Sequence, residues 1–181
     1  MAAGGGRTPM TDADRFEAFV REYQDMVFAT AVRLLANPAE AEDIAQTVFL
    51  RAFERFSSIG TSATAAGWLK TVTTNLCLNH LARYRARWQF FSELDRPGDE
   101  RYETTLAAAS NDAVEAASRQ EALEQAVTAL PDHQRVPLVL FHFEDMSYKE
   151  IAAALGISLA KVKTDIHRGR EVLKRAMTGV V

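Results

Sequence analysis

The segment from Ser147 to Arg170 constrains the fold of this chain more than any other. Ser147-Tyr-Lys-Glu150 has the spacing of a capping box, in which the serine hydroxyl accepts from the N–H three residues on and the glutamate reaches back. An apolar face follows, made of Ile151, Ala154 and Leu155. Gly156 stands where a left-handed residue closes a helix, and Ser158 suits the cap of the next one. A short helix, a glycine turn and a capped second helix predict a helix-turn-helix.

The second of these helices separates into two faces at about 100° per residue. Its apolar side consists of Leu159, Val162, Ile166 and Leu173. The other side and its flanks carry the residues expected to contact DNA: Lys161, Lys163, Thr164, Asp165, His167, Arg168 and Arg170. Arg168 and Lys161 have donors that suit guanine in the major groove, and the other basic side chains can hold phosphates. A surface helix with solvated charges is the alternative, but the caps and the glycine turn favour a DNA-recognition helix.

The remaining apolar periodicity is helical, with no segment typical of a strand. It predicts three further helices before the middle of the chain, over 14–36, 38–56 and 67–90, with a small polar loop between the last two. A fourth helix ends at Pro131. A fifth is expected over 135–144, with Pro137 in its first turn.

These elements predict an all-α protein of two small helical domains joined by a flexible acidic linker. Residues 92–113 lose the periodicity, contain Pro97-Gly98 and are rich in acids, as is typical of a partly disordered linker. The expected organisation is a flexible N-terminal tail over 1–12, a first domain over 13–91, this linker, and the helix-turn-helix domain over 114–181.

The distribution of charge fits DNA binding better than the net charge of −3 does. Between Glu93 and Glu124 nine acids accompany three bases, whereas Lys161 to Arg175 holds six bases and two acids. The stretch from His80 to Trp88 has three arginines and no acid. The basic residues are therefore gathered into two short segments that can meet phosphates.

Other classes of protein are disfavoured. The single cysteine, Cys77, excludes an internal disulfide and a cysteine-cluster metal site, and its apolar neighbours indicate a buried position. No phosphate-binding loop or nucleophile motif is present, so neither an enzyme nor a cofactor is expected. The chain has no apolar run long enough for a membrane span, and its first residues lack the pattern of a signal peptide, so the cytoplasm is the expected location.

Several segments together resemble the extracytoplasmic-function (ECF, group IV) sigma factors of the sigma-70 family. Residues 41–53 (AEDIAQTVFLRAF) look like the helix that binds the polymerase clamp, and residues 68–75 (WLKTVTTN) with Asn79-His80-Leu81 look like the segment leading to the −10 reader. Residues 130–136 (LPDHQRV) and 162–170 (VKTDIHRGR) look like the −35-reading domain. The resemblance covers about residues 16–177, with these segments in the family's order.

The resemblance implies a factor that binds core RNA polymerase and directs promoter-specific initiation, reading −35 DNA as duplex and −10 DNA as melted strand. Its partners would be the β′ clamp helices and β flap of the polymerase, promoter DNA and an anti-sigma factor, with no membrane insertion. The implied polymerase contacts are Asp43, Gln46 and Thr47. The implied −10 contacts are Asn75, Asn79, His80 and Arg83, which we expect to share one helix face, and the 57–66 loop would capture a flipped base. Phe49 and Phe53 are expected to lie in the core, with the polymerase interface as the alternative.

Two positions depart from the family pattern. Thr47 stands where the family often has an acid, and Asp165 where it often has arginine. An acid on a groove-facing helix can accept from cytosine, so we expect Asp165 to alter the −35 preference. A helix-turn-helix repressor or activator that works without polymerase is the alternative function. It would account for residues 114–181 but not for the segments at 41–53 and 68–80.

Overall fold

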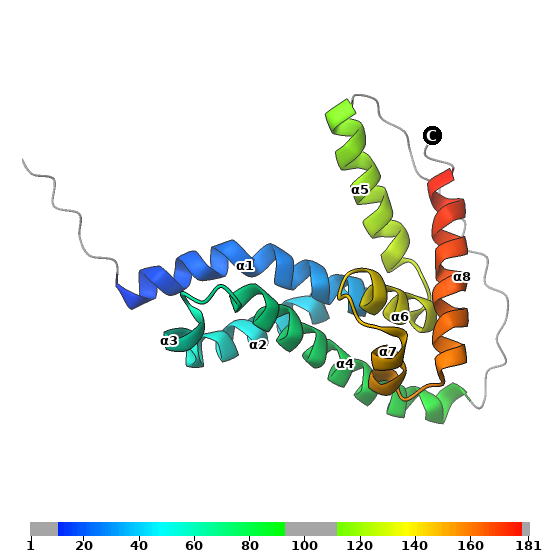
Figure 1. Cartoon of the computed structure of the whole chain (residues 1–181), viewed down its shortest axis with the longest axis horizontal. Coiled ribbons are helices and arrows are strands. Elements are labelled where there is room, and N and C mark those ends of the chain that lie inside the picture. Colours follow the sequence, from blue (N-terminus) through cyan, green and yellow to red (C-terminus); the bar gives the residue numbers. More distant parts are fainter. Residues whose placement is uncertain (1–10, 93–111, 179–181) are drawn as a thin grey trace, which may run out of the picture.

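The computed structural model of the chain is built of helices throughout the part that it describes, residues 11–92 and 112–178. Most of the expected N-terminal tail and linker lies outside these residues. Figure 1 shows the order of the elements along the chain. They are α1 (Asp12–Leu35), α2 (Pro38–Glu54), α3 (Phe56–Ile59), α4 (Ala65–Ser92), α5 (Asp112–Thr128), α6 (Asp132–His142), α7 (Tyr148–Leu155) and α8 (Leu159–Thr178). No described helix is long and apolar enough to cross a membrane.

In the first group of helices, α1 to α4, capping residues set where α1 starts and ends and where α2 starts. Thr11 and Asp14 form a capping box at the start of α1, and Ala36 ends it in the left-handed conformation, with φ of 51°. The Asn37 side chain accepts from the first N–H groups of α2, and Pro38 occupies its first turn. Helices α2 and α4 both pack on α1. The expectation of a loop over 57–66 is partly wrong, because the short helix α3 occupies the first residues of that segment.

The second group, α5 to α8, contains the helix-turn-helix. Helix α6 begins at Asp132, three residues before the expected start, so Pro137 lies inside the helix rather than in its first turn. Helix α8 packs against α5, α6 and α7. At the crossing with α6, Gly169 allows a close approach: a Cβ there would lie 2.8 Å from Leu138 Cδ1, so the Leu138 side chain would have to shift.

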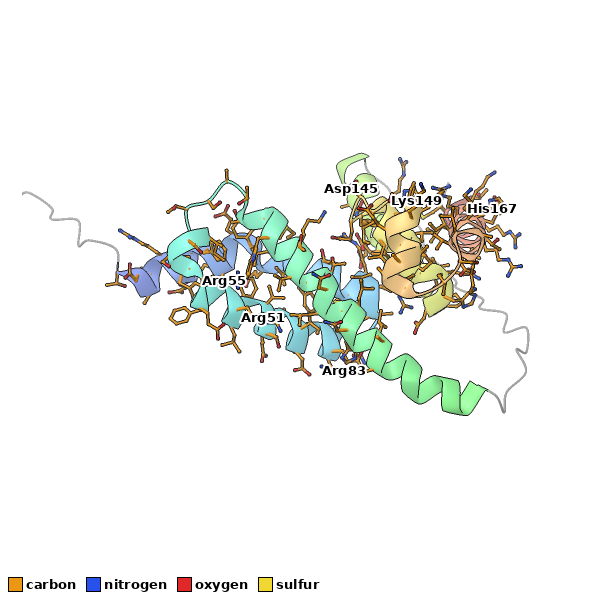
Figure 2. The ribbon with its side chains drawn as sticks, turned by 60° about the horizontal axis from the view of Figure 1, so that its bottom comes forward. Arg51, Arg55, Arg83, Asp145, Lys149 and His167 are labelled. Atoms are coloured by element: carbon orange, nitrogen blue, oxygen red, sulfur yellow. The ribbon has the colours of Figure 1, made fainter. Side chains whose placement is uncertain are left out.

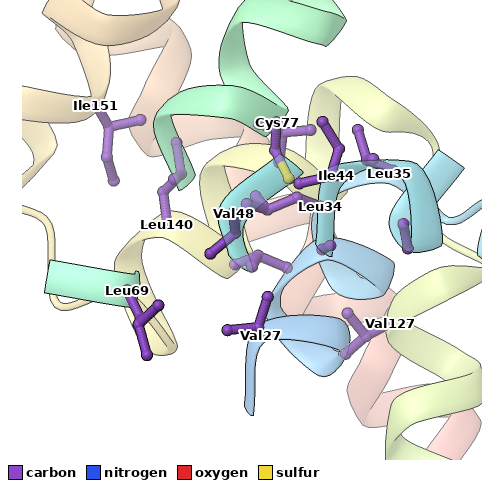
Figure 3. Packing of buried hydrophobic residues seen from close by; sticks show 14 of the residues in the cluster. Val27, Leu34, Leu35, Ile44, Val48, Leu69, Cys77, Val127, Leu140 and Ile151 are labelled. Carbon is purple, nitrogen blue, oxygen red and sulfur yellow. The ribbon is translucent and has the colours of Figure 1, made fainter. Parts of the chain in front are cut away.

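The two groups pack against each other. One continuous cluster of buried side chains joins Leu34, Val48 and Leu69 of the first group to Val136 and Leu140 of the second. Figure 3 shows part of this cluster, and Figure 1 shows the end of α1 meeting α6. This contact between the expected domains has no signature in the sequence pattern.

Candidate nucleic-acid and polymerase interfaces

The corner of the helix-turn-helix is set by the caps that the sequence predicts. The Ser147 hydroxyl accepts from Glu150 N and the Glu150 carboxylate accepts from Ser147 N, which closes the capping box at the start of α7. Gly156 ends α7 with φ of 64°, and Lys161 N donates to Ser158 Oγ at the start of α8. Ile157, between the two helices, packs against the core. The turn therefore fixes the direction of α8 relative to α7.

Helix α8 presents a polar and basic face to solvent. The exposed residues of that face that were expected to contact DNA are Lys161, Lys163, Thr164, His167, Arg168 and Arg170. Figure 2 shows His167 at the outer side of the helix. Val162, Ile166 and Gly169 are buried on the opposite side, against the rest of the domain. The exposed face therefore has the donors and the position that a recognition helix requires.

Asp165 does not lie on this exposed face. Its side chain is only 3% exposed, and both of its carboxylate oxygens accept from Lys161 Nζ, at 3.1 and 2.8 Å. The expectation of a groove-facing acid that accepts from cytosine is thus not met in this structure. One helical turn separates the two residues, so the buried carboxylate also ties Lys161 to the surface of the domain.

Arg170 is held by the neighbouring helix α6. Its Nε donates to His142 Nε2 at 3.0 Å, and its guanidinium lies 5.3 Å from the centre of the Phe141 ring. Burial, followed by the charge of Arg170, lowers the pKa of His142. A neutral imidazole can accept this hydrogen bond, whereas a protonated one cannot. The sequence gives no sign that His142 positions Arg170, because the pair is 28 residues apart.

On α4, three of the four residues expected to contact −10 DNA lie on one exposed face. Asn75, Asn79 and Arg83 are each exposed and fall four residues apart. Figure 2 shows Arg83 toward the far end of the helix. His80 lies at the edge of this face, half-buried beside α2, with Nε2 3.1 Å from Glu40 Oε2. The expectation that all four share a face is therefore wrong for His80.

The outer face of α2 carries an exposed apolar pair among polar residues. Asp43 and Gln46 are exposed, and the Thr47 hydroxyl donates to the Asp43 carbonyl oxygen at 2.9 Å. On the same face Leu50 is 67% exposed and Phe53 is 61% exposed.

The expectation for the two phenylalanines is half right. Phe49 packs against the core, but Phe53 lies largely outside it and touches only the rim, where its ring meets that of Phe16 edge-on at 5.0 Å. Leu50 was not expected to be functional, although its spacing of four residues from Gln46 is the signal that could have identified it. Exposed apolar side chains with a polar surround are typical of a protein-binding surface.

No group of three or more metal-ligating side chains occurs among the residues that the structure describes. Cys77 is fully buried in α4, as expected, and burial together with Glu144 raises the pKa of its thiol to about 12. A thiol so protected stays protonated and is a poor nucleophile.

Comparisons with known proteins match both groups of helices. The family model of sigma-70 region 2 matches residues 19–87, and that of sigma-70 region 4 matches residues 120–173. The chain is 32% identical over 169 residues to the ECF RNA polymerase sigma factor SigW of Bacillus subtilis, which covers 92% of this chain and 90% of SigW. It is 36% identical over 161 residues to the ECF RNA polymerase sigma factor SigE of Mycolicibacterium smegmatis, covering 88% of this chain and 60% of SigE.

A solved structure of the sigma factor RpoE with the anti-sigma factor NepR from Bartonella quintana is also similar. It is 19% identical to this chain and has a TM-score of 0.49, over 90% of this chain and 96% of RpoE. This likeness is too weak to support an argument about partners or about the arrangement of the domains.

Proposed function

The chain belongs to the ECF sigma factors of the sigma-70 family, and we propose that, as a group IV member, it reads the −35 element as duplex and the −10 element as melted DNA. Members of this family act in promoter-specific transcription initiation, and they do so by binding rather than by catalysis. The observation that carries the proposal is the presence of both sigma-70 regions, in order, on one chain. We place the protein in the cytoplasm, where its polymerase and its promoters are.

We assign polymerase binding to the outer face of α2. Asp43, Gln46 and Thr47 form the polar part of this face, and Leu50 and Phe53 form its apolar part. Burial of two exposed apolar side chains against the β′ clamp helices supplies affinity, while the polar residues fix orientation. The second domain contacts the β flap in the same assembly.

We assign −35 recognition to the exposed face of α8. Arg168 can donate to guanine O6 and N7, and Thr164 and His167 lie beside it on the same face. Lys163 and Arg170 hold phosphates, and the bond from Arg170 to His142 fixes the direction of its guanidinium.

Asp165 acts on −35 recognition through Lys161 rather than by touching a base. The ammonium of Lys161 is occupied by the buried carboxylate, which limits its reach into the groove. Because Asp165 departs from the family pattern, it restrains Lys161, which contacts bases, and so alters promoter choice.

The −10 contacts are assigned to the α4 face formed by Asn75, Asn79 and Arg83. Amide and guanidinium groups in a row can read base edges and hold the backbone of a separated strand. His80, at the edge of this face, supports it indirectly through its contact with Glu40 of α2. The segment at 57–66 is proposed to receive a flipped −10 base. Membership in the family also implies an anti-sigma factor as an inhibitory partner.

Binding to purified core polymerase separates this function from that of a repressor or activator that acts alone. We expect the full chain to co-elute with core polymerase in gel filtration and to support run-off transcription from a cognate promoter. A double variant, Asp43→Ala with Gln46→Ala, should weaken co-elution without loss of helical content. A chain that binds promoter DNA but never associates with core polymerase would contradict the proposal.

A further inference from the structure

Helix α6 contributes two side chains to the edge of the −35-reading face of α8. The two helices pack against each other, as Figure 1 shows. His142 is the last residue of α6, and Phe141 precedes it. Both reach the same residue of α8, Arg170, which is exposed. A helix that carries none of the expected DNA contacts therefore touches one of them.

Two contacts hold the guanidinium of Arg170 at this edge. Its Nε donates to His142 Nε2 at 3.0 Å, and its Cζ lies 5.3 Å from the centre of the Phe141 ring, within range of a cation–π contact. The Phe141 ring is itself supported, because its centre lies 4.7 Å from that of Tyr148 in α7 and 4.9 Å from that of His142. A side chain that is otherwise rich in rotamers is thus confined by rings from two neighbouring helices.

The hydrogen-bond acceptor of His142 is what sets the direction of this arginine. Burial and, after it, the charge of Arg170 lower the pKa of His142 from 6.5, so the ring is neutral at pH 7.5. In a neutral ring whose Nε2 accepts, the proton lies on Nδ1. An apolar side chain at position 142 would leave Arg170 Nε without this partner and the guanidinium free to turn.

The contact to His142 leaves a particular pair of donors for a ligand. Because Nε is occupied, the fork that remains is the end of the guanidinium, Nη1 and Nη2, whose planar geometry matches two oxygens of one phosphate. Lys163 lies seven residues earlier on the same side of α8, or about 10 Å along the axis at ~1.5 Å per residue. Cations in a row along the edge of a groove-inserted helix are suited to the phosphates of one strand.

We propose that His142 and Phe141 are positioning residues for a phosphate site at the edge between α6 and α8, in which Arg170 binds one phosphate of the −35 duplex. The inference rests on the proposed −35 reading and names the ligand of Arg170 and the residues that prepare it. Orienting a flexible arginine in advance lowers the entropy lost when DNA binds. Since every nucleotide carries a phosphate, His142 sets the affinity for the −35 duplex and leaves its sequence preference unchanged.

The test measures the affinity of the holoenzyme, assembled from the full chain, for a fragment that carries a promoter it uses, at several salt concentrations. His142→Leu removes the acceptor, whereas His142→Gln keeps one at a similar reach. Arg170→Ala removes the cation, and the double variant of His142→Leu with Arg170→Ala completes a mutant cycle. His133→Leu is the matched control, because His133 is an exposed histidine of the same helix whose ring contacts Gln134. Circular dichroism checks that each variant is folded.

The losses should follow the chain of contacts from His142 to Arg170 to phosphate. We expect Arg170→Ala to weaken binding by roughly 3- to 10-fold and to reduce the slope of log affinity against log salt by about 0.9, the value for one phosphate. His142→Leu should weaken binding by roughly 2- to 5-fold, within the effect of one hydrogen bond, and His142→Gln should restore most of the loss. Once Arg170 is alanine, His142→Leu should cause no further loss.

Two further readouts separate positioning of a phosphate contact from a merely structural role. The −35 sequences recovered in a binding-site selection should be the same for the wild-type chain and for His142→Leu. In the free full-length chain, the ¹⁵N spectrum of the imidazole should show His142 protonated at Nδ1 and unprotonated at Nε2. Arg170→Ala should shift the Nε2 signal of His142, and the His133→Leu control should shift neither this signal nor the affinity.

Unchanged affinity in His142→Leu, or equal losses in His142→Leu and His142→Gln, would overturn the role of the acceptor. An additive loss in the double variant would show that His142 does not act through Arg170, and an altered −35 preference in His142→Leu would rule out a pure phosphate contact. Failure of the wild-type holoenzyme to bind any promoter would instead refute the proposed function, and the ¹⁵N spectrum would still decide whether His142 holds Arg170.

Discussion

Replacing Leu50 by alanine tests whether the outer face of α2 is a binding surface. Full burial of a leucine side chain contributes about 1.5–3 kcal/mol, and Leu50 is 67% exposed, so a partner that covers it gains roughly 1–2 kcal/mol. Its loss should weaken binding to core polymerase by roughly 5- to 30-fold. Stability of the free chain should change by less than about 0.5 kcal/mol, because little of the side chain is buried beforehand.

The assay is titration of fluorescently labelled protein with core polymerase, alongside urea unfolding of the same variants. Phe53→Ala should also weaken binding, although it gives up a ring contact with Phe16 and so costs some stability. Phe28→Ala is the matched control, since Phe28 is an exposed phenylalanine on α1 rather than on the α2 face. Equal affinity of the wild-type and Leu50→Ala chains for polymerase would refute the assignment of this face.

Three further predictions concern single positions. Ala36→Gly should raise the free energy of unfolding by about 0.5–1 kcal/mol in urea titrations, because φ of 51° strains an alanine but not a glycine. The pKa of Glu144 is raised above 4.5 in the folded chain, so its contribution to stability is full below pH 4.5 and is lost as the pH rises through the raised value. Glu144→Gln should remove that pH dependence of the urea midpoint, and an unaltered pH profile would contradict the role of the carboxyl group. Asp165→Asn should release Lys161 and change the sequences recovered in a −35 binding-site selection, whereas an identical set would leave Asp165 without a role in recognition.

The parts of the fold that follow from local chemistry could be predicted from the sequence. The caps at Ser147 and Ser158 and the left-handed Gly156 need only neighbouring residues, and they lie where the pattern places them. The expected start of α6 was three residues late. Proline is common in the first turn of a helix, so Pro137 pointed to a later start, whereas the helix begins directly after Pro131.

The parts that depend on packing could not be predicted in this way. Asp165 looks like a surface residue on a helical projection, but packing of the domain covers it. Phe53 looks like a core residue because it is aromatic and in register with Phe49, but no element of the described chain covers its outer side. Glu144 gives no local hint of its position, since its partners lie about 70 residues away on another domain. Segments far away in the sequence decide whether a polar residue is buried, and a local sequence pattern carries no information about them.

The central claim is tested most directly by mapping transcript 5′ ends made in vitro from genomic DNA by core polymerase, with and without this protein. We predict a discrete set of new start sites, each preceded by two shared sequence elements at a fixed spacing. A pattern of starts that does not change when the protein is added would contradict the claim that it directs promoter-specific initiation.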